Sequence, residues 1–315
     1  MAGQLRDIKR RITSVQSTQK ITRAMELISS SRIIKAQQRV RAAHPYAEAM
    51  RRLVSSVAQN ASNVDHPLLK ERDHVRSVGH IVISSDRGLA GAYNSNVIRA
   101  AERDMQAHGK DTSLFLVGKK AVSYFRFRGY DFEDSWTGVS DQPSIADARK
   151  IAGAAVKAFT EGAIDQVRLA YTRFESALVQ RPTILQVLPL PKEELERDDN
   201  EQGSGPRASY IFEPEPEEIL DYLLPRYVEA AILQAMLEAS ASEHAARRRA
   251  MKAATDNADE LIEDLTRVYN QARQAEITTE IMEVVGGAEA LTSASDEEDD
   301  SGFSRVPASV SEGTS

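Results

Sequence analysis

One short turn carries the side chains best placed for chemistry. Residues 79–105 have the pattern of a strand, a glycine-containing turn and a helix, and the turn reads DRGLAGAYN. A helix N-terminus reached through glycines can bind a phosphate, because its free N–H groups and the helix dipole favour an anion. Asp86 lies at the carboxyl end of the strand, where an open α/β sheet places ligands. The spacing of Gly88 and Gly91 nevertheless matches neither the dinucleotide-binding motif nor the Walker A motif.

The rest of the chain offers no catalytic group that can be assembled from spacing. There is no cysteine, which excludes disulfides, thiolate metal sites and cysteine nucleophiles. The six histidines are scattered, and only residues 65–80 bring several of them together. We interpret that segment as a polar loop rather than a metal site. The motifs therefore predict no catalytic residue, no metal and no cofactor.

A second polar group lies near the C-terminus, where an apolar helical pattern would otherwise continue. Its members are Arg273, Gln274, Thr278, Thr279 and Glu280. Such a group is either an ordinary solvated helix face or a set of hydrogen-bonding side chains for a partner that surrounds the helix. Both interpretations remain open at this point.

Long helical patterns at the two ends of the chain must position these groups. In residues 1–60 apolar positions recur at intervals of three and four. They are Leu5, Ile8, Ile12, Val15, Ile21, Met25, Ile28, Ala36, Val40 and Ala43. A coiled-coil alternation near the C-terminus comprises Met251, Ala254, Ala258, Leu261, Leu265, Val268 and Ala272. We expect the two helices to pair antiparallel with each other, and pairing with a second copy of the chain is the alternative.

Strand-like and helix-like segments alternate between these helices, which predicts a Rossmann-like α/β domain with a mostly parallel sheet. Its last two strands follow each other without a helix and should form an antiparallel pair. The fold class is thus α/β (α+β), a long antiparallel two-helix coiled coil plus this domain. The predicted boundaries are 1–60 for the N-terminal helix, 76–192 for the α/β domain, 193–209 for a linker, 210–287 for the C-terminal helix and 288–315 for a disordered acidic tail.

Charge is distributed unevenly along the chain. Residues 1–60 hold twelve Lys and Arg against three Asp and Glu, whereas residues 288–315 hold seven acids against Arg305. The basic helix has Tyr46 as its one aromatic residue, so it lacks a platform for stacking bases. We expect an acidic protein surface as its partner rather than nucleic acid. No run of 18 apolar residues exists, so any membrane association should be indirect.

Three separated segments resemble one known family, the γ subunit of the F-type ATP synthase. They are QSTQKITRAME, SSDRGLAGAYN and MKAATDNADELIEDLTRVYNQARQAEITTEIMEVVGGAEAL, and the resemblance spans residues 1–291 in order. It implies a central rotor whose coiled coil lies inside a ring of three α and three β subunits. It also implies that the α/β domain contacts the ε subunit and the membrane c ring, and that the chain catalyses nothing alone.

The resemblance implies particular contact residues as well. Those facing the β subunits would be Arg23, Met25, Asp86, Arg87, Arg247, Arg273, Gln274, Thr278 and Glu280. Those facing the c ring and ε would be Tyr210, Phe212 and Glu213, although Phe212 stands where the family often has Tyr. The implied location is the cytoplasmic side of a bacterial inner membrane. The alternative is a stand-alone coiled-coil protein whose α/β domain binds a nucleotide.

Overall fold

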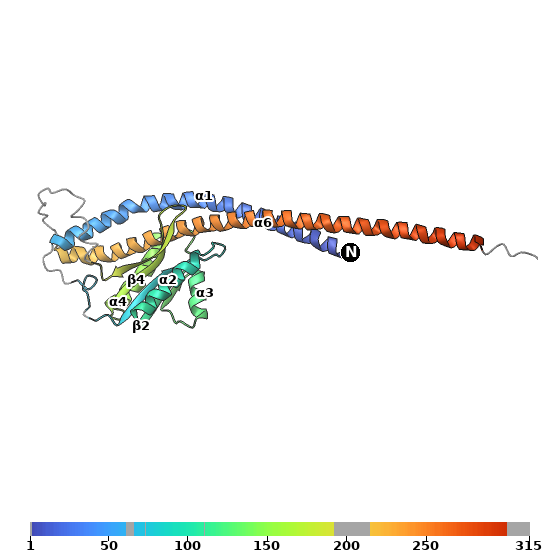
Figure 1. The fold of residues 1–315 in the computed structure, drawn as a ribbon. Coiled ribbons are helices and arrows are strands. Elements are labelled where there is room, and N and C mark those ends of the chain that lie inside the picture. Colours follow the sequence, from blue (N-terminus) through green and yellow to red (C-terminus); the bar gives the residue numbers. More distant parts are fainter. Residues whose placement is uncertain (1, 61–65, 73, 110, 192–214, 301–315) are drawn as a thin grey trace, which may run out of the picture. The chain divides into compact units, whose positions relative to one another are not determined.

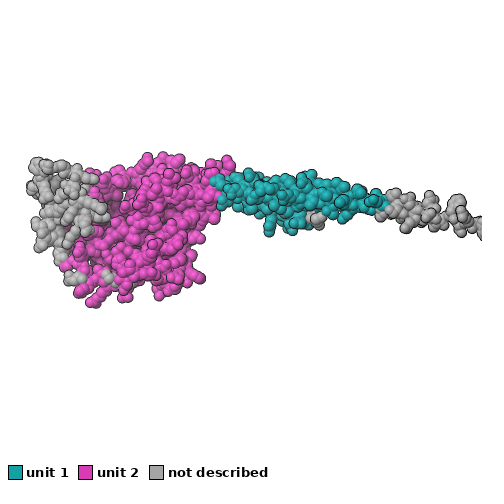
Figure 2. All heavy atoms as spheres, viewed as in Figure 1, with its two compact units in different colours: residues 1–20, 255–315 teal, residues 21–254 magenta. Residues whose placement is uncertain are grey.

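The computed structural model describes residues 2–60, 66–72, 74–109, 111–191 and 215–300 (Figure 1). Along the chain the elements are α1 (Ala2–Asn60), β1 (Ser77–Ile83), α2 (Tyr93–His108), β2 (Asp111–Val117), α3 (Lys119–Phe127), β3 (Asp134–Trp136), α4 (Ile145–Thr160), β4 (Gln166–Phe174), β5 (Gln180–Leu188) and α6 (Pro216–Asp300). The chain divides into two compact units, residues 1–20 with 255–315 and residues 21–254 (Figure 2). Each unit is described by itself.

The larger unit contains a five-stranded sheet in the order β3-β2-β1-β4-β5. Strand β1 pairs parallel with β2 and β4, and β2 pairs parallel with β3. Strand β5 is antiparallel to β4. The expected sheet, mostly parallel with an antiparallel final pair, is therefore confirmed.

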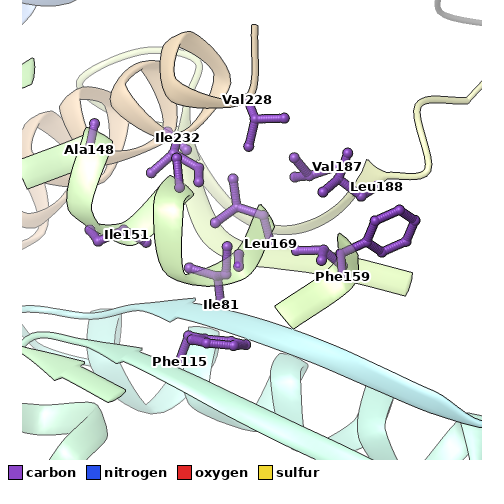
Figure 3. Close-up of a cluster of buried hydrophobic side chains, with 14 of the residues drawn as sticks. Ile81, Phe115, Ala148, Ile151, Phe159, Leu169, Val187, Leu188, Val228 and Ile232 are labelled. Carbon is purple, nitrogen blue, oxygen red and sulfur yellow. The ribbon is translucent and has the colours of Figure 1, made fainter. Parts of the chain in front are cut away.

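Both faces of this sheet are covered by helices. Successive residues of a strand point to opposite faces, so Ile81 belongs to one apolar cluster and Val82 to the other. The cluster around Ile81 packs against α4 and α6 (Figure 3). It also includes Val54 and Val57 from the last turns of α1. The cluster around Val82 packs against α2 and α3. Complete burial of such a side chain contributes about 1.5–3 kcal/mol to folding. The two apolar clusters therefore stabilise the sheet whose edge carries the candidate site.

Local signals in the sequence explain where two of these helices begin and end. Helix α4 begins with a capping box, in which the Ser144 side chain accepts a hydrogen bond from the N–H of Asp147 and the Asp147 carboxylate accepts one from the N–H of Ser144. Helix α2 ends at Gly109, which adopts a left-handed φ of 55°. Glycine has no Cβ and takes this conformation without strain.

In the smaller unit, the start of α1 and the later part of α6 lie side by side and antiparallel. The Gln19 amide donates a hydrogen bond to the Asp259 carboxylate. From this pair, partly buried side chains continue to the start of α1 and along α6 as far as Glu276. Leu5, the first of these side chains on α1, is 14 residues before Gln19, and Glu276 is 17 residues after Asp259, which is the relation expected of antiparallel helices.

Part of the seam predicted for this stretch of α6 is wrong. Ala258, Leu265 and Ala272 face inward as expected, but Leu261 and Val268 are exposed. Their places in the seam are taken by Ile262 and Tyr269, and the buried Thr255 belongs to the same register. Both sets alternate by three and four, so spacing alone could not choose between them. The partner helix made the choice by burying one flank of α6 and leaving the other open.

A similar correction applies to α1 within the larger unit. Ile21 and Ile28 were predicted in the seam but are 60% and 54% exposed. Thr22 and Ser29 are buried in their place. The steps of three and four that start at Leu5 lead to these polar residues when they are followed without interruption. Threonine and serine at these positions interrupt the apolar pattern, so the sequence alone favours the neighbouring isoleucines.

The C-terminal helix also runs further than expected. Helix α6 continues through Gly286 and Gly287 to Asp300, whereas a stop was predicted at the two glycines and a disordered tail after them. A glycine inside a helix costs about 1 kcal/mol relative to alanine but does not block the backbone hydrogen bonds. Ala288, Glu289 and Leu291, which follow, are good helix formers. The predicted linker 193–209 lies outside the described residues.

Candidate functional site at the carboxyl edge of the sheet

The turn after β1 brings the chain to the carboxyl edge of the sheet. Leu89 and Gly91 both adopt left-handed backbone angles, with φ of 61° and 56°. Ser84 lies at the base of the turn, where its hydroxyl donates to the carbonyl of Val117 and accepts from the N–H of Ala121. A Cβ at Gly118 would come within 2.3 Å of the Ser84 carbonyl oxygen, so only glycine fits there. The loops after β1 and β2 are therefore in direct contact.

Asp86 joins three of the loops at this edge. Its carboxylate accepts hydrogen bonds from the N–H groups of Lys119 and Ser140, each at 3.1 Å. Its own N–H donates to the Ser140 hydroxyl at 3.0 Å. Burial acts to raise the pKa of Asp86, but backbone hydrogen bonds from Gly138, Ser140 and Lys119 outweigh it and lower the pKa below 3.8. The carboxylate thus links loops within the domain, and the partner contact predicted for it stays a prediction.

Helix α6 closes the same edge from the other side. The Tyr93 hydroxyl, at the start of α2, donates to the carbonyl of Ala239 at 3.1 Å. The Ser242 hydroxyl donates to the carbonyl of Thr172 on β4 at 3.1 Å. One bond joins α6 to α2 and the other joins it to β4. They hold α6 against the edge where an open α/β sheet binds its ligand.

A recess of about 310 Å³ beside Gly91 is the space nearest to the predicted phosphate turn. Arg249 lines it and would be the natural cation for a phosphate. The Arg249 guanidinium, however, donates to the carbonyl of Leu178 and to the side chain of Gln180. Two of its nitrogens are therefore engaged by the β4–β5 hairpin, which disfavours the nucleotide hypothesis.

Among the described residues predicted to contact a partner, Arg247 is the most buried. It is 6% exposed, and its guanidinium donates to the Glu243 carboxylate at 2.6 Å and to the carbonyl of Gly88 at 3.2 Å. Burial raises the pKa of Glu243, and the charge and hydrogen bond of Arg247 act against that rise. Arg247 therefore ties α6 to the turn of DRGLAGAYN, and its contact with a partner stays a prediction.

Sequence reasoning missed a second polar group beside this pair. Asp141, in the loop between β3 and α4, accepts hydrogen bonds from Arg32 Nη1 at 2.5 Å on both carboxylate oxygens. His244 Nε2 lies 3.1 Å from Oδ1 of the same carboxylate, and the Ser240 hydroxyl donates to the carbonyl of Asp141 at 3.3 Å. An acidic residue just after the third strand was the available signal, since carboxyl ends of parallel strands share one edge.

Burial governs the protonation of this group. It lowers the pKa of His244 to about 4, and the neighbouring cations Arg247, Arg32 and Arg87 add to this, while Asp141 opposes it. Burial acts to raise the pKa of Asp141, but the hydrogen bond and charge of Arg32 bring it below 3.8. At neutral pH the group therefore consists of a charged Asp141–Arg32 pair and an uncharged His244.

The other predicted contact residues lie on helix surfaces or outside the described residues. In the larger unit Arg23 and Arg87 are exposed and Met25 is half-buried. In the smaller unit the predicted group on α6 is exposed throughout, comprising Arg273, Gln274, Thr278 and Glu280. The Thr278 hydroxyl donates to the carbonyl of Gln274 one turn earlier, at 2.9 Å. Tyr210, Phe212 and Glu213 lie outside the described residues.

Apolar side chains beside this exposed group were not singled out from the sequence. Ile277, Ile281, Met282, Val284 and Val285 are between 42% and 73% exposed on the later turns of α6.

Among the described residues, no helix is long and apolar enough to cross a membrane. In the same ranges no three His, Asp or Glu side chains are grouped so as to hold a metal ion.

Comparison with known proteins gives consistent results. A family model described as ATP synthase matches residues 4–291. The ATP synthase gamma chain of Kineococcus radiotolerans is 50% identical over 300 residues, which cover 93% of this chain and 98% of that protein. The gamma chain of Acidothermus cellulolyticus is 50% identical over 304 residues, covering 94% and 100%.

Solved structures share the fold. The central stalk and c ring structure of the Tetrahymena thermophila mitochondrial ATP synthase contains a chain that is 26% identical, with a TM-score of 0.56, covering 74% of this chain and 99% of that one. A chain in the Euglena gracilis mitochondrial ATP synthase, from a structure of OSCP, F1 and the c ring, is 18% identical with a TM-score of 0.62, covering 94% and 97%. The second likeness shows the fold alone.

Proposed function

Because the chain belongs to the ATP synthase gamma chain family, we propose that it is the rotor of the central stalk and carries torque between the membrane c ring and the catalytic β subunits. The observation that carries the proposal is the match of nearly the whole chain, both terminal helices and the sheet domain, to gamma chains. A partial match would leave open that one module had been reused in another protein.

The proposed partners are three α and three β subunits around the paired helices, with ε and the c ring at the sheet domain. The chain then has no catalytic site of its own, and it acts by changing the conformations of the β subunits as it turns. Coupling of this kind requires that the rotor has different interaction energies with the alternative states of its neighbours. Exposed polar side chains on α6, such as Gln274 and Thr278, suit contacts that must form and break at each step.

We place the complex on the cytoplasmic side of a bacterial inner membrane, where the chain is held peripherally through ε and the c ring. The proposed contacts at that end are Tyr210, Phe212 and Glu213. At the other end they are Arg273, Gln274, Thr278 and Glu280, and beside the sheet domain Arg23, Met25, Asp86, Arg87 and Arg247.

Reconstitution tests the proposal directly. Purified α and β subunits are mixed with and without this chain, the complexes are separated by size, and ATP hydrolysis is measured in each. We expect a stable complex containing one copy of the chain and a clear rise in hydrolysis. Absence of both would refute the rotor function.

The alternative, a stand-alone nucleotide-binding protein, is tested on the free chain. Calorimetric titration with ATP and magnesium should show no tight binding, because the turn after β1 is closed by α6 and Arg249 is engaged by the hairpin. Tight binding together with hydrolysis by the free chain would support the alternative instead.

A further inference from the structure

The side chain of Asp141 contacts both terminal helices from a loop of the sheet domain. Its carboxylate accepts a hydrogen bond from Arg32 of α1 and lies 3.1 Å from His244 Nε2 of α6. Its backbone carbonyl accepts a hydrogen bond from Ser240 of α6. All four residues lie in the larger unit. One acidic residue therefore joins three parts of the chain that are far apart in sequence.

The two helices are attached to the sheet domain in different ways. Helix α6 contributes seven buried residues to the apolar cluster on its face of the sheet, from Leu220 to Ala239. Helix α1 contributes Val54 and Val57, which lie near its end. Arg32 is 22 residues earlier, about 33 Å along the helix axis. The Arg32–Asp141 pair is thus a link between α1 and the domain far from the apolar packing.

The geometry of this link restricts rotation. Arg32 reaches both oxygens of the carboxylate, and His244 is 3% exposed and approaches from α6. A single nitrogen of Arg32, Nη1, lies 2.5 Å from both oxygens, so the guanidinium is centred on the carboxylate. Turning α1 about its own axis would separate Arg32 from the carboxylate, and turning α6 would separate His244 from it and break the Ser240 hydrogen bond.

We propose that Asp141 is a positioning residue that holds α1 and α6 at one rotation relative to the sheet domain, so that torque on the domain reaches both helices together. The inference rests on the rotor function proposed above. Without this residue the domain would still turn α6 through its apolar packing, but α1 could rotate more freely relative to the domain. Loss of the link should therefore matter under load more than in free rotation.

The test compares Asp141→Asn with the parent chain in the assembled complex, using inverted membrane vesicles. ATP hydrolysis is measured with the membrane made permeable to protons, and the largest ATP-driven proton gradient is measured with the membrane sealed. We expect hydrolysis within about twofold of the parent and a gradient reduced by about half or more, since a partly exposed ion pair contributes modestly. Asp141→Glu, which keeps the charge, should recover most of the gradient.

Arg128→Gln is the matched control. It removes a pair with Glu102, at 3.1 Å, that lies entirely within the sheet domain. It should leave both measurements at the parent level. An unchanged gradient in Asp141→Asn, or an equal loss in the control, would overturn the proposal.

A second variant keeps the test decisive if Asp141→Asn fails to assemble. Arg32→Gln removes the bond to α1 and leaves His244 and Ser240 in place. It should reproduce the loss of gradient. Where Asp141→Asn does assemble, the double variant should be no worse than either single variant, because both act on one contact. A parent-like gradient in Arg32→Gln, or additive losses, would overturn the proposal. Failure of the parent chain itself to support a gradient would instead refute the rotor function.

Discussion

Arg247 on α6 donates to the carbonyl oxygen of Gly88 at 3.2 Å, in the turn that resembles a phosphate-binding loop. Its other partner, Glu243, is 2% exposed, so the ion pair is almost completely removed from water. A turn that could receive an anion from outside is thus held by a cation from within the same chain. The contact is with a backbone oxygen, which any residue at position 88 would offer.

Removal of Arg247 alone should destabilise the larger unit strongly. Arg247→Met leaves Glu243 buried without its cation, which costs about 3–5 kcal/mol. The double variant Glu243→Met/Arg247→Met removes both charges and should recover much of that loss. Urea unfolding followed by circular dichroism measures the difference. Equal losses in the single and double variants would show that the pair is not the source of the stability.

Acid should weaken the same region through His244. The pKa of His244 is about 4 in the folded chain and 6.5 for a free histidine, so the unfolded chain binds a proton at a higher pH than the folded chain does. Stability therefore falls as the pH drops from about 6.5 to about 4, by roughly 3 kcal/mol for this residue, and changes no further below that. His244→Gln should flatten this part of the profile when the free energy of unfolding is measured at a series of pH values. An identical slope in the variant would contradict the assignment.

The corrected seam of α1 can be tested with two isoleucines. Ile33 is 5% exposed and Ile28 is 54% exposed. Ile33→Ala should cost about 2–5 kcal/mol. Ile28→Ala should change the free energy of unfolding by less than about 0.5 kcal/mol, as surface substitutions usually do. Thermal unfolding of the two variants side by side decides the matter, and a larger loss at Ile28 would restore the seam expected from the sequence.

Gln274→Leu tests the polar contacts proposed for the later part of α6. The side chain of Gln274 is exposed, so the variant should unfold like the parent. In the reconstituted complex it should lower ATP turnover, because leucine cannot make the hydrogen bonds proposed for the glutamine. Arg267→Gln is the control, since Arg267 is 69% exposed and pairs with Asp264 on the same helix. Parent-like turnover in Gln274→Leu would remove this residue from the contact set.

The parts of the fold that follow from local pattern were predictable. Segments such as SVGHIVISS and TILQVLPL show the apolar content of buried strands, and the absence of a helix between the last two strands indicated their antiparallel pairing. The helix registers were harder, because Ile21 and Thr22 are neighbours and the partner helix decides which one is buried. Spacing predicts that a seam exists, but the packing partner selects its members.

The polar groups at the sheet edge show the opposite limit. Asp86 was found because a strand, a turn and a helix surround it in the sequence. Arg32, Asp141 and His244 come from three distant segments, and each one alone resembles an ordinary surface charge. Their association depends on the parallel sheet bringing its loops to one edge and on α1 and α6 passing that edge together. Neither condition can be read from the neighbours of any one residue.

Among the described residues, the antiparallel arrangement of α1 and α6 leaves the turns of α6 from Ile277 to Glu289 without a companion helix. Side chains from Ile277 to Glu289 are exposed, and several of them are large and apolar. A lone helix in water is held by local hydrogen bonds and opens readily. Limited proteolysis of the isolated chain should therefore open this stretch of α6, and the assembled complex should protect it. The stiffness of this end of α6 therefore depends on the subunits that surround it in the complex.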